Sequence, residues 1–500
     1  MPLPSKHHAV ARSSAPCDGQ HRSIGWRLAA LAVLAMLGTT ACHGGNSRAS
    51  TASTAAVLQR IDAEARAHAL PGYAVVLFDR SGVVAEHHGG AANLAAGTAV
   101  DAGTLFPLAS LTKTWSAVVV LQLVEEGALR LDQPVIELLP DVRLPHAVQV
   151  RHLLSHKSQG TPGRHFHYDG RRYGLLGRII EVTSGESFAQ ALERRIIAPL
   201  QLRDTFLLGA TATATPRLAS IATPYRDPGG LDGPTPCDPE YGYSASAGLV
   251  STARDVAAFE QALLAGELLA PAQLALIVTP FLPDGPSGLG SFVQTVDGRR
   301  LVWAYGQYDC HAALTLFDPE RRSGVVFLAN TSTPADAARL LYGDVTASPI
   351  ALAWLGVPED AMLHERAALV RDAFFAQAQP ARLDAAIAAA DRFLERHPEQ
   401  RRTPDLVVAH ALATLGSTAM RTRQQRPVRF DAAIEAKTMA VLAADGGNPY
   451  AHYYLASTYA AQGRHAQARA HFQAIVSAPN AARNWYTREA EAALSAGAAD

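Results

Sequence analysis

Residues 108–114 read LASLTKT and place Ser110 three positions before Lys113. On a helix, positions i and i+3 lie on one face about 5–6 Å apart, so the lysine amine can reach the serine hydroxyl. A buried lysine can lose its proton and act as the base for a serine nucleophile. A serine at the entry of a helix also gains from the backbone N–H groups there, which favour developing negative charge. The stretch therefore predicts a nucleophile and its base at the start of a helix.

Lysine is rare in this chain, which makes Lys113 more informative. Of 44 basic residues only four are lysines, namely Lys6, Lys113, Lys157 and Lys437, and the S-x-x-K pattern occurs once. Arginine stays protonated at any useful pH, whereas a lysine can serve as a base. A lysine could also stand at position 113 by chance, so the surrounding sequence has to decide whether Lys113 is functional.

The composition is that of a globular protein with a large core. The 500 residues are 48% hydrophobic and 18% charged, with a net charge of −1 and a pI near 7.0. This length favours two or three domains. Because no basic stripe is present, nucleic acid is not expected as a partner.

Further motifs flank the Ser110–Lys113 pair in a fixed order. Together with that pair they resemble the β-lactamase and penicillin-binding-protein-like family, in particular its class C β-lactamase-like serine hydrolases, over residues 54–355. The resemblance implies an α+β fold, in which an antiparallel sheet is flanked by helices and joined to an all-helical region. The stretches that carry it are residues 71–76, 104–106, 150–156, 173–177, 247–253, 303–307 and 328–330.

The resemblance also assigns roles to individual residues. Ser110 would be the nucleophile, Lys113 the base and Tyr168 the proton shuttle. The backbone N–H groups of Ser110 and Gln307 would form the oxyanion hole, and Tyr305, Gly306 and Gln307 would line the substrate. No cofactor is implied, and no metal site is expected, because His165 and His167 lack a third ligand.

Two positions depart from the family pattern. The second motif, Y-x-N, is here Tyr168-Asp169-Gly170, and the third, a Lys or His followed by x-Gly, is here Ala304-Tyr305-Gly306. A lost acid–base partner costs about 10²–10⁴-fold in rate and a lost electrostatic donor about 10²–10³-fold. Activity would then be weakened rather than erased. A cationic side chain beside the second motif could compensate, or these could be solvated loop residues: Arg164, His165, His167, Arg171 and Arg172.

Local patterns predict the order of secondary structure. Apolar runs bounded by turn residues predict strands at 72–79 and 82–88, and again at 289–295, 300–305, 312–317 and 324–329. Helical spacing predicts helices at 57–69, 112–126, 150–155, 174–183 and 256–264. Strands at both ends with helices between them favour the α+β class.

From residue 360 to 500 the sequence is Ala-rich and helical. Residues 448–479 fit the tetratricopeptide pattern of two packed helices, and 383–398 and 430–448 resemble second helices of degraded units. We therefore predict a tetratricopeptide-like domain, which could recruit a protein partner. A plain helical bundle would give nearly the same sequence.

The first 42 residues have the features of an export signal. A positive region precedes the apolar run 28–37, which is too short for a permanent membrane span. Small residues then lead to Cys42, the residue that a lipoprotein signal would present for acylation. Ordinary cleavage nearby is the alternative, and residues 43–53 are predicted to be a tether. Either route predicts an exported, periplasmic protein, whose only membrane contact would be a lipid on Cys42.

Two other cysteines, Cys237 and Cys310, would remain in the exported chain. They could pair in an oxidising compartment or stay as two buried thiols, and the sequence does not decide between these.

The residues thus predict an exported serine hydrolase acylated at Ser110, with an ester, an amide or a peptidoglycan-like peptide as substrate. The alternative is a catalytically impaired family member that binds a ligand in its cleft and a protein through its helical C-terminal region.

Overall fold

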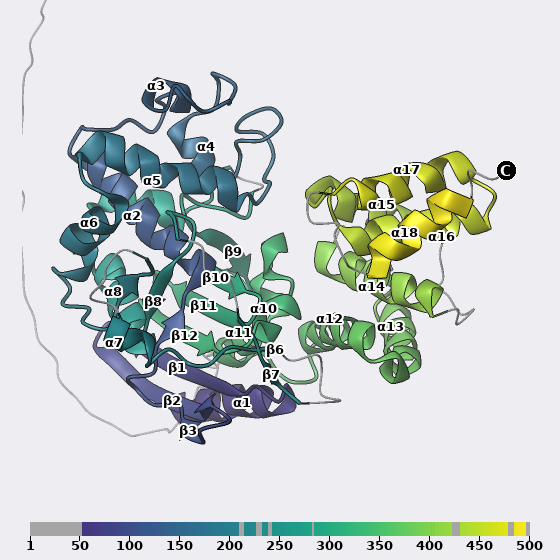
Figure 1. Ribbon diagram of the computed structural model, residues 1–500. Helices are drawn as coiled ribbons and strands as arrows, with labels where there is room; N and C mark the ends of the chain where they lie inside the picture. The colour runs from purple at the N-terminus through teal and green to yellow at the C-terminus, as the bar shows by residue number, and fades with distance from the viewer. Residues whose placement is uncertain are drawn as a thin grey trace, which may run out of the picture. The chain divides into compact units, whose positions relative to one another are not determined.

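The computed structural model in Figure 1 describes most of the chain after residue 52. The predicted signal (1–42), Cys42 and the tether apart from Ser53 lie outside the described residues. Among the residues described, no helix is both long enough and apolar enough to cross a membrane. The described ranges are 53–209, 215–226, 233–238, 243–282, 285–401, 403, 405–422, 431–478 and 485–496.

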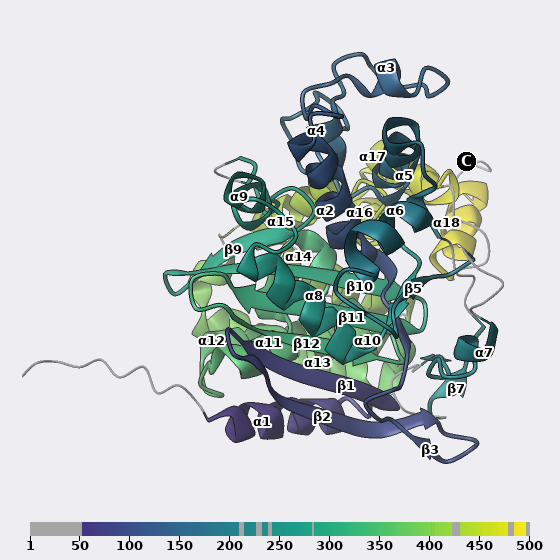
Figure 2. The same ribbon diagram turned by 90° about the vertical axis from the view of Figure 1, so that its left-hand side faces the viewer.

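A large antiparallel sheet organises the region up to residue 355. Within the described residues it has seven strands in the order β3-β2-β1-β12-β11-β10-β9, so the first and last strands of the region pair in its middle (Figure 2). Tyr73 on β1 lies opposite Ala329 on β12. The strands are β1 (Gly72–Asp79), β2 (Gly82–Asn93), β3 (Thr98–Ala99), β9 (Phe292–Val296), β10 (Arg299–Tyr308), β11 (His311–Asp318) and β12 (Ser323–Ala329).

Both faces of this sheet are covered, which explains the nearly continuous apolar runs of its central strands. On β1, Ala74, Val76 and Phe78 join one core, and Val75 and Leu77 join another on the opposite face. The first core also takes in buried residues of α2, α5 and α8 (Figure 1). The second takes in residues of α1 and α11.

The helices of this region confirm the sequence-based predictions to within a few residues. The helix predicted at 112–126 is α2, and the one predicted at 174–183 begins four residues earlier, as α5. The bounds are α1 (Thr54–Ala67), α2 (Thr112–Glu125), α3 (Val135–Leu138), α4 (Val150–Leu154), α5 (Gly170–Ser184), α6 (Phe188–Leu192), α7 (Thr215–Leu218), α8 (Ala253–Ala265), α9 (Pro271–Val278), α10 (Thr333–Asp336) and α11 (Pro349–Leu355).

Two smaller sheets complete the region up to residue 355, called the hydrolase-like region below. β4 (Phe106–Pro107) and β5 (Phe206–Leu207) both pair with β8 (Leu249–Ser251), which brings β8 beside the nucleophile turn. β6 (Tyr225–Arg226) pairs with β7 (Thr235–Pro236).

The C-terminal region is helical, as predicted. Within the predicted repeat at 448–479, Leu455, Ala456 and Tyr459 on α16 pack in one cluster with Ala468 and Phe472 on α17. Whether the region is a repeat array stays a prediction. The helices are α12 (Met362–Ala378), α13 (Leu383–Arg396), α14 (Leu406–Arg421), α15 (Ala432–Ala444), α16 (Pro449–Ala461), α17 (His465–Val476) and α18 (Trp485–Ala496).

The two cysteines left open by the sequence are joined. A disulfide links Cys237, next to β7, to Cys310 in the turn between β10 and β11. It therefore ties the β6–β7 hairpin to the strand that carries Tyr305 and Gln307.

Candidate active site

Ser110 lies in a tight 3₁₀ turn, Ala109–Leu111, immediately before α2, rather than in α2 itself. The preceding residue, Ala109, has φ 46°. A non-glycine residue in this left-handed region is strained, and such strain collects at functional sites. Two hydrogen bonds join strand β8 to this turn. Leu108 N–H donates to Leu249 O at 2.7 Å, and Leu249 N–H donates to Thr112 Oγ1 at 3.1 Å.

Lys113 meets Ser110 as the spacing predicted. Its Nζ is 2.9 Å from Ser110 Oγ and 2.8 Å from the carbonyl oxygen of Ser246, and the residue is 5% exposed. The same Nζ lies over the rings of Tyr168 and Tyr173, at 5.1 and 5.5 Å from their centroids. This distance to Ser110 is the reach that a general base needs.

Tyr168, the predicted proton shuttle, lies in a group of aromatic rings on the side of the site that faces Ser110 and Lys113, called the facing side below. Its ring stacks on His156 at 4.4 Å and lies 6.4 Å from Phe292 and 6.0 Å from Tyr305. Asp169 fixes the position of Tyr168 along the chain by capping α5, where its carboxylate accepts from Arg172 N–H at 3.0 Å.

Burial sets the protonation of the groups around Tyr168. Desolvation, with the charge of Lys113 adding to it, holds the pKa of His156 well below 6.5, so this imidazole is neutral. Its Nδ1 accepts from Asp169 N–H at 3.1 Å. Desolvation also raises the pKa of Tyr305 well above 10, and Tyr305 is hydrogen-bonded to Tyr168. The side chains of His156 and Tyr305 therefore stay uncharged at neutral pH.

The cavity behind Ser110 is small. Its volume is about 20 Å³, roughly room for one water molecule. Ser110, Lys113, Tyr168 and Tyr305 all line it, so the structure brings these four predicted residues together. The rest of the lining comes from His156, Tyr173, Ser287, Gly290, Ser291, Phe292 and Ala304.

The two departures from the family motifs face this site. A Cβ built on Gly170 would lie 3.9 Å from Ser246 Oγ and 4.0 Å from Lys113 Nζ, so the position has room for a side chain directed at the base. Ala304 lines the cavity with a methyl group where the family has a cation.

Gly306 is a glycine because the strand passes so close to the nucleophile turn. A Cβ there would lie 1.8 Å from the carbonyl oxygen of Leu108. The backbone of Gly306 and Gln307 thus runs beside Ser110, which is what an oxyanion hole built from backbone N–H groups requires. The oxyanion role itself stays a prediction. The side chain of Gln307 donates to Asp336 instead of lining the small cavity.

None of the five positive side chains near the second motif lines the cavity. Arg164, His165 and Arg171 are exposed, and Arg172 donates to the carbonyl oxygen of Ser158. Among the residues that the structure describes, no group of three or more His, Cys, Asp or Glu side chains could hold a metal ion.

Sequence reasoning missed several residues of the site, among them three that contact Lys113 or Tyr168. Ser246 accepts from Lys113, His156 stacks on Tyr168, and Tyr173 donates to the carbonyl oxygen of Lys113 at 2.9 Å. Each lies within or next to a stretch that carries the family resemblance. The sequence therefore pointed to the position of each residue but not to the contact that it makes.

The family model described as Beta-lactamase matches residues 57–346, more than half of the chain. Penicillin-binding protein 4 of Amycolatopsis lactamdurans is 30% identical over 184 residues, which cover 30% of this chain and 48% of that protein. The chain thus spans about half the length of this relative. Esterase EstB of Burkholderia gladioli is 27% identical over 358 residues, covering 59% of this chain and 86% of the esterase.

Solved structures agree on the fold. The octameric penicillin-binding protein homologue from Pyrococcus abyssi superposes with a TM-score of 0.55 at 22% identity, covering 63% of this chain and 81% of that one. With the family model matched over most of the hydrolase-like region, the chain is a member of the β-lactamase-like family of serine hydrolases.

Proposed function

We propose that this protein is an exported serine hydrolase that is acylated at Ser110 by an ester, an amide or a peptidoglycan-like peptide. The observation that carries the proposal is the 2.9 Å contact between Lys113 Nζ and Ser110 Oγ, with both groups at one cavity. The family relationship supports the hydrolase class, and the substrate is our proposal from the residues of the site.

The residues suit a two-step acyl transfer. Ser110 Oγ attacks the substrate carbonyl carbon while its proton passes to Lys113 Nζ, and the backbone N–H groups of Ser110 and Gln307 stabilise the oxyanion. The carbon–heteroatom bond then breaks, and Tyr168 relays the proton to the leaving group. A water molecule attacks the acyl-enzyme, and the acid product leaves with Ser110 restored.

The missing cation at Ala304 narrows the substrate class. In the family pattern this position steadies a substrate carboxylate beside the nucleophile. Its replacement by a methyl group argues against efficient hydrolysis of carboxylate-bearing β-lactams. We therefore favour an esterase type of activity, or a D-alanyl peptidase type that does not depend on a cation at position 304 for the substrate carboxylate.

Export is supported by the disulfide between Cys237 and Cys310, since such bonds persist in oxidising compartments. We propose a periplasmic location, with Cys42 as the lipidated residue. Incorporation of radiolabelled palmitate, lost in Cys42→Ala, tests the anchor, and a protein without label in either form would contradict it.

The test of the enzyme proposal is covalent labelling. The mature protein is incubated with a fluorophosphonate probe or with penicillin, and its intact mass is measured beside that of Ser110→Ala. We expect one adduct on the wild type and none on the variant. An adduct that persists in Ser110→Ala would contradict the assignment of the nucleophile.

A second function is favoured by Gly170 and Ala304, because these residues lack the two side chains that assist catalysis in the family pattern. In that case the protein binds a ligand in its cleft without turnover and a protein through its helical region. The absence of an adduct, with unchanged stability in Lys113→Ala, would support binding. Ala304→His then tests whether the missing cation limits the site, because an improved rate of acylation would return the enzyme proposal to first place.

A further inference from the structure

A second and larger cavity begins at Gln307. Its volume is about 660 Å³, and sites for small molecules are on the order of 300–1,000 Å³. One wall comes from β10 and the segment after β12, and the other wall comes from the helical C-terminal region. The residues that matter below are Gln307, Asp336 and Arg339 on the first wall and Phe374, Gln377 and Tyr450 on the second.

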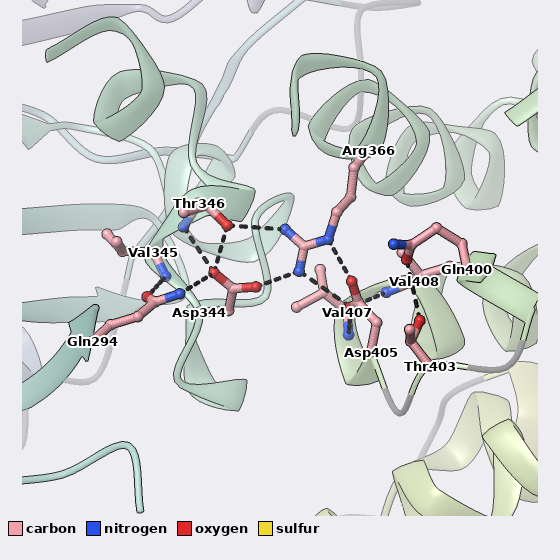
Figure 3. Close-up of polar contacts among 10 residues, drawn as sticks. All are labelled: Gln294, Asp344, Val345, Thr346, Arg366, Gln400, Thr403, Asp405, Val407 and Val408. Atoms are coloured by element: carbon pink, nitrogen blue, oxygen red, sulfur yellow. Dashed lines mark hydrogen bonds and ion pairs between the residues drawn. The ribbon is translucent and has the colours of Figure 1, made fainter. Parts of the chain in front are cut away.

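The helical wall is fastened to the hydrolase region by buried polar contacts. Arg366 on α12 is 3% exposed and pairs with Asp405, with Nε 2.6 Å from Oδ2, and with Asp344 in the segment after β12 (Figure 3). Asn448, which caps α16, donates to the hydroxyl of Tyr342 at 3.1 Å. Breaking a buried ion pair is strongly unfavourable, so α12 and α16 are fixed parts of the cavity.

Two opposite charges face this cavity from one short segment. Arg339 has φ 48°, a strained backbone for a non-glycine residue, and its Nε is buried without a hydrogen-bond partner in the described part of the chain. Asp336 accepts from Gln307 and Ser332, which leaves capacity for further donors, since a carboxylate can accept about four hydrogen bonds. Among the described residues no ion pair within 4.0 Å joins Asp336 to Arg339. Arg339 also hydrogen-bonds Tyr342 and lies 5.7 Å from the centroid of its ring, so its unpartnered Nε and the spare acceptor positions of Asp336 are what the cavity offers to a ligand.

The large cavity lies next to the small one along β10. Tyr305 lines the small cavity behind Ser110, and Gln307, two residues further along β10, lines the large one. The side chain of Gln307 joins Asp336, while its backbone lies beside the nucleophile turn. A substrate held in the large cavity would therefore extend toward Ser110.

We propose that the large cavity binds the free amino-acid head group of the substrate, with its ammonium at Asp336 and its carboxylate at Arg339. The helical C-terminal region is then a wall of the substrate site, and Phe374 and Tyr450 cover the apolar chain that leads to the scissile bond. This inference rests on the proposed hydrolase function and names its substrate class, an acyl compound that ends in a zwitterion.

The test uses four p-nitroanilides of matched length. γ-Glutamyl carries both charges, glutaryl only the carboxylate, γ-aminobutanoyl only the ammonium, and butanoyl neither. Binding to the full-length Ser110→Ala protein is measured by titration calorimetry, so that no turnover interferes. We expect the γ-glutamyl compound, as its D or L form, to bind about tenfold or more tightly than each of the others, the effect of one charged hydrogen bond. Equal binding of the butanoyl compound would overturn the proposal.

Variants assign each charge and the helical wall. Arg339→Gln should reduce γ-glutamyl affinity to that of γ-aminobutanoyl, and Asp336→Asn to that of glutaryl. Gln377→Trp should fill the cavity from α12 and weaken binding, whereas Gln473→Trp, an exposed position on α17 outside the cavity, should not. Equal effects of the two tryptophans would exclude the helical region from the site.

The outcomes also separate this inference from the proposed function. Zwitterion binding without fluorophosphonate labelling of the wild type would support the cavity and contradict the hydrolase. Labelling of Ser110 without preference for the zwitterion would support the hydrolase and overturn the cavity assignment.

Discussion

The two sides of the small catalytic cavity are built in different ways. On the nucleophile side, hydrogen bonds to backbone atoms hold Ser110 and Lys113, and β8 clamps the turn. On the facing side, Tyr168 is held mainly by ring stacking, and two neighbouring positions have lost their polar side chains, at Gly170 and Ala304. Backbone contacts fix a group whatever the nearby side chains, so the nucleophile side can keep its geometry while the facing side varies.

The largest effect should follow from removing the base on the nucleophile side. Lys113→Met should lower the rate of Ser110 acylation by about 10²–10⁴-fold, because the serine hydroxyl loses its proton acceptor. The measurement is the rate of fluorophosphonate labelling followed by intact mass. Lys157→Met is the control, because Lys157 is also a buried lysine but does not contact Ser110. An equal loss in both variants would show a structural effect instead.

The next effect concerns the strand that meets the nucleophile turn. Gly306→Ala should lower the free energy of unfolding by about 1–3 kcal/mol, because its Cβ would overlap the carbonyl oxygen of Leu108. Chemical denaturation measures the loss. In Gly103→Ala the new Cβ meets only Asp101 Oδ1, at 3.6 Å, so this control should keep its stability. A stable Gly306→Ala would mean that the strand can move away from the turn.

The contrast between the two sides also explains what the sequence could predict. The Ser110–Lys113 pair and the bounds of β1 follow from local spacing, and both were predicted. The stacking of Phe292 on Trp303 beside Tyr168 depends on strands β9 and β10 meeting a residue more than a hundred positions earlier. The disulfide was left open for the same reason, because spacing does not show which turns meet. Ser246 was missed because its contact with Lys113 uses a carbonyl group, which every residue has.

Restoring the facing side should have a moderate effect. Gly170→Asn places an amide beside Lys113 Nζ and Ser246 Oγ, where the structure has room for a Cβ. We expect acylation of Ser110 to become about tenfold faster, which is below the roughly 10²–10³-fold that one well-placed electrostatic donor contributes. Gly170→Ala supplies the same Cβ without the amide and should give no gain. Equal rates in the two variants would show that the facing side does not limit the reaction.

The smallest effect is a pH dependence that comes from His156, which lies behind Tyr168. Burial lowers its pKa well below 6.5, so the folded protein leaves it neutral while the unfolded chain protonates it below that pH. Its contribution to stability is therefore present above pH 6.5 and is lost as the pH falls from 6.5 toward the folded pKa. The loss should be about 1 kcal/mol over the first unit. Denaturation curves at several pH values should show this slope in the wild type and a smaller one in His156→Phe, which keeps a ring against Tyr168. Equal slopes would mean that His156 takes up its proton in the folded state, and the facing side would then be open to water rather than closed by its rings.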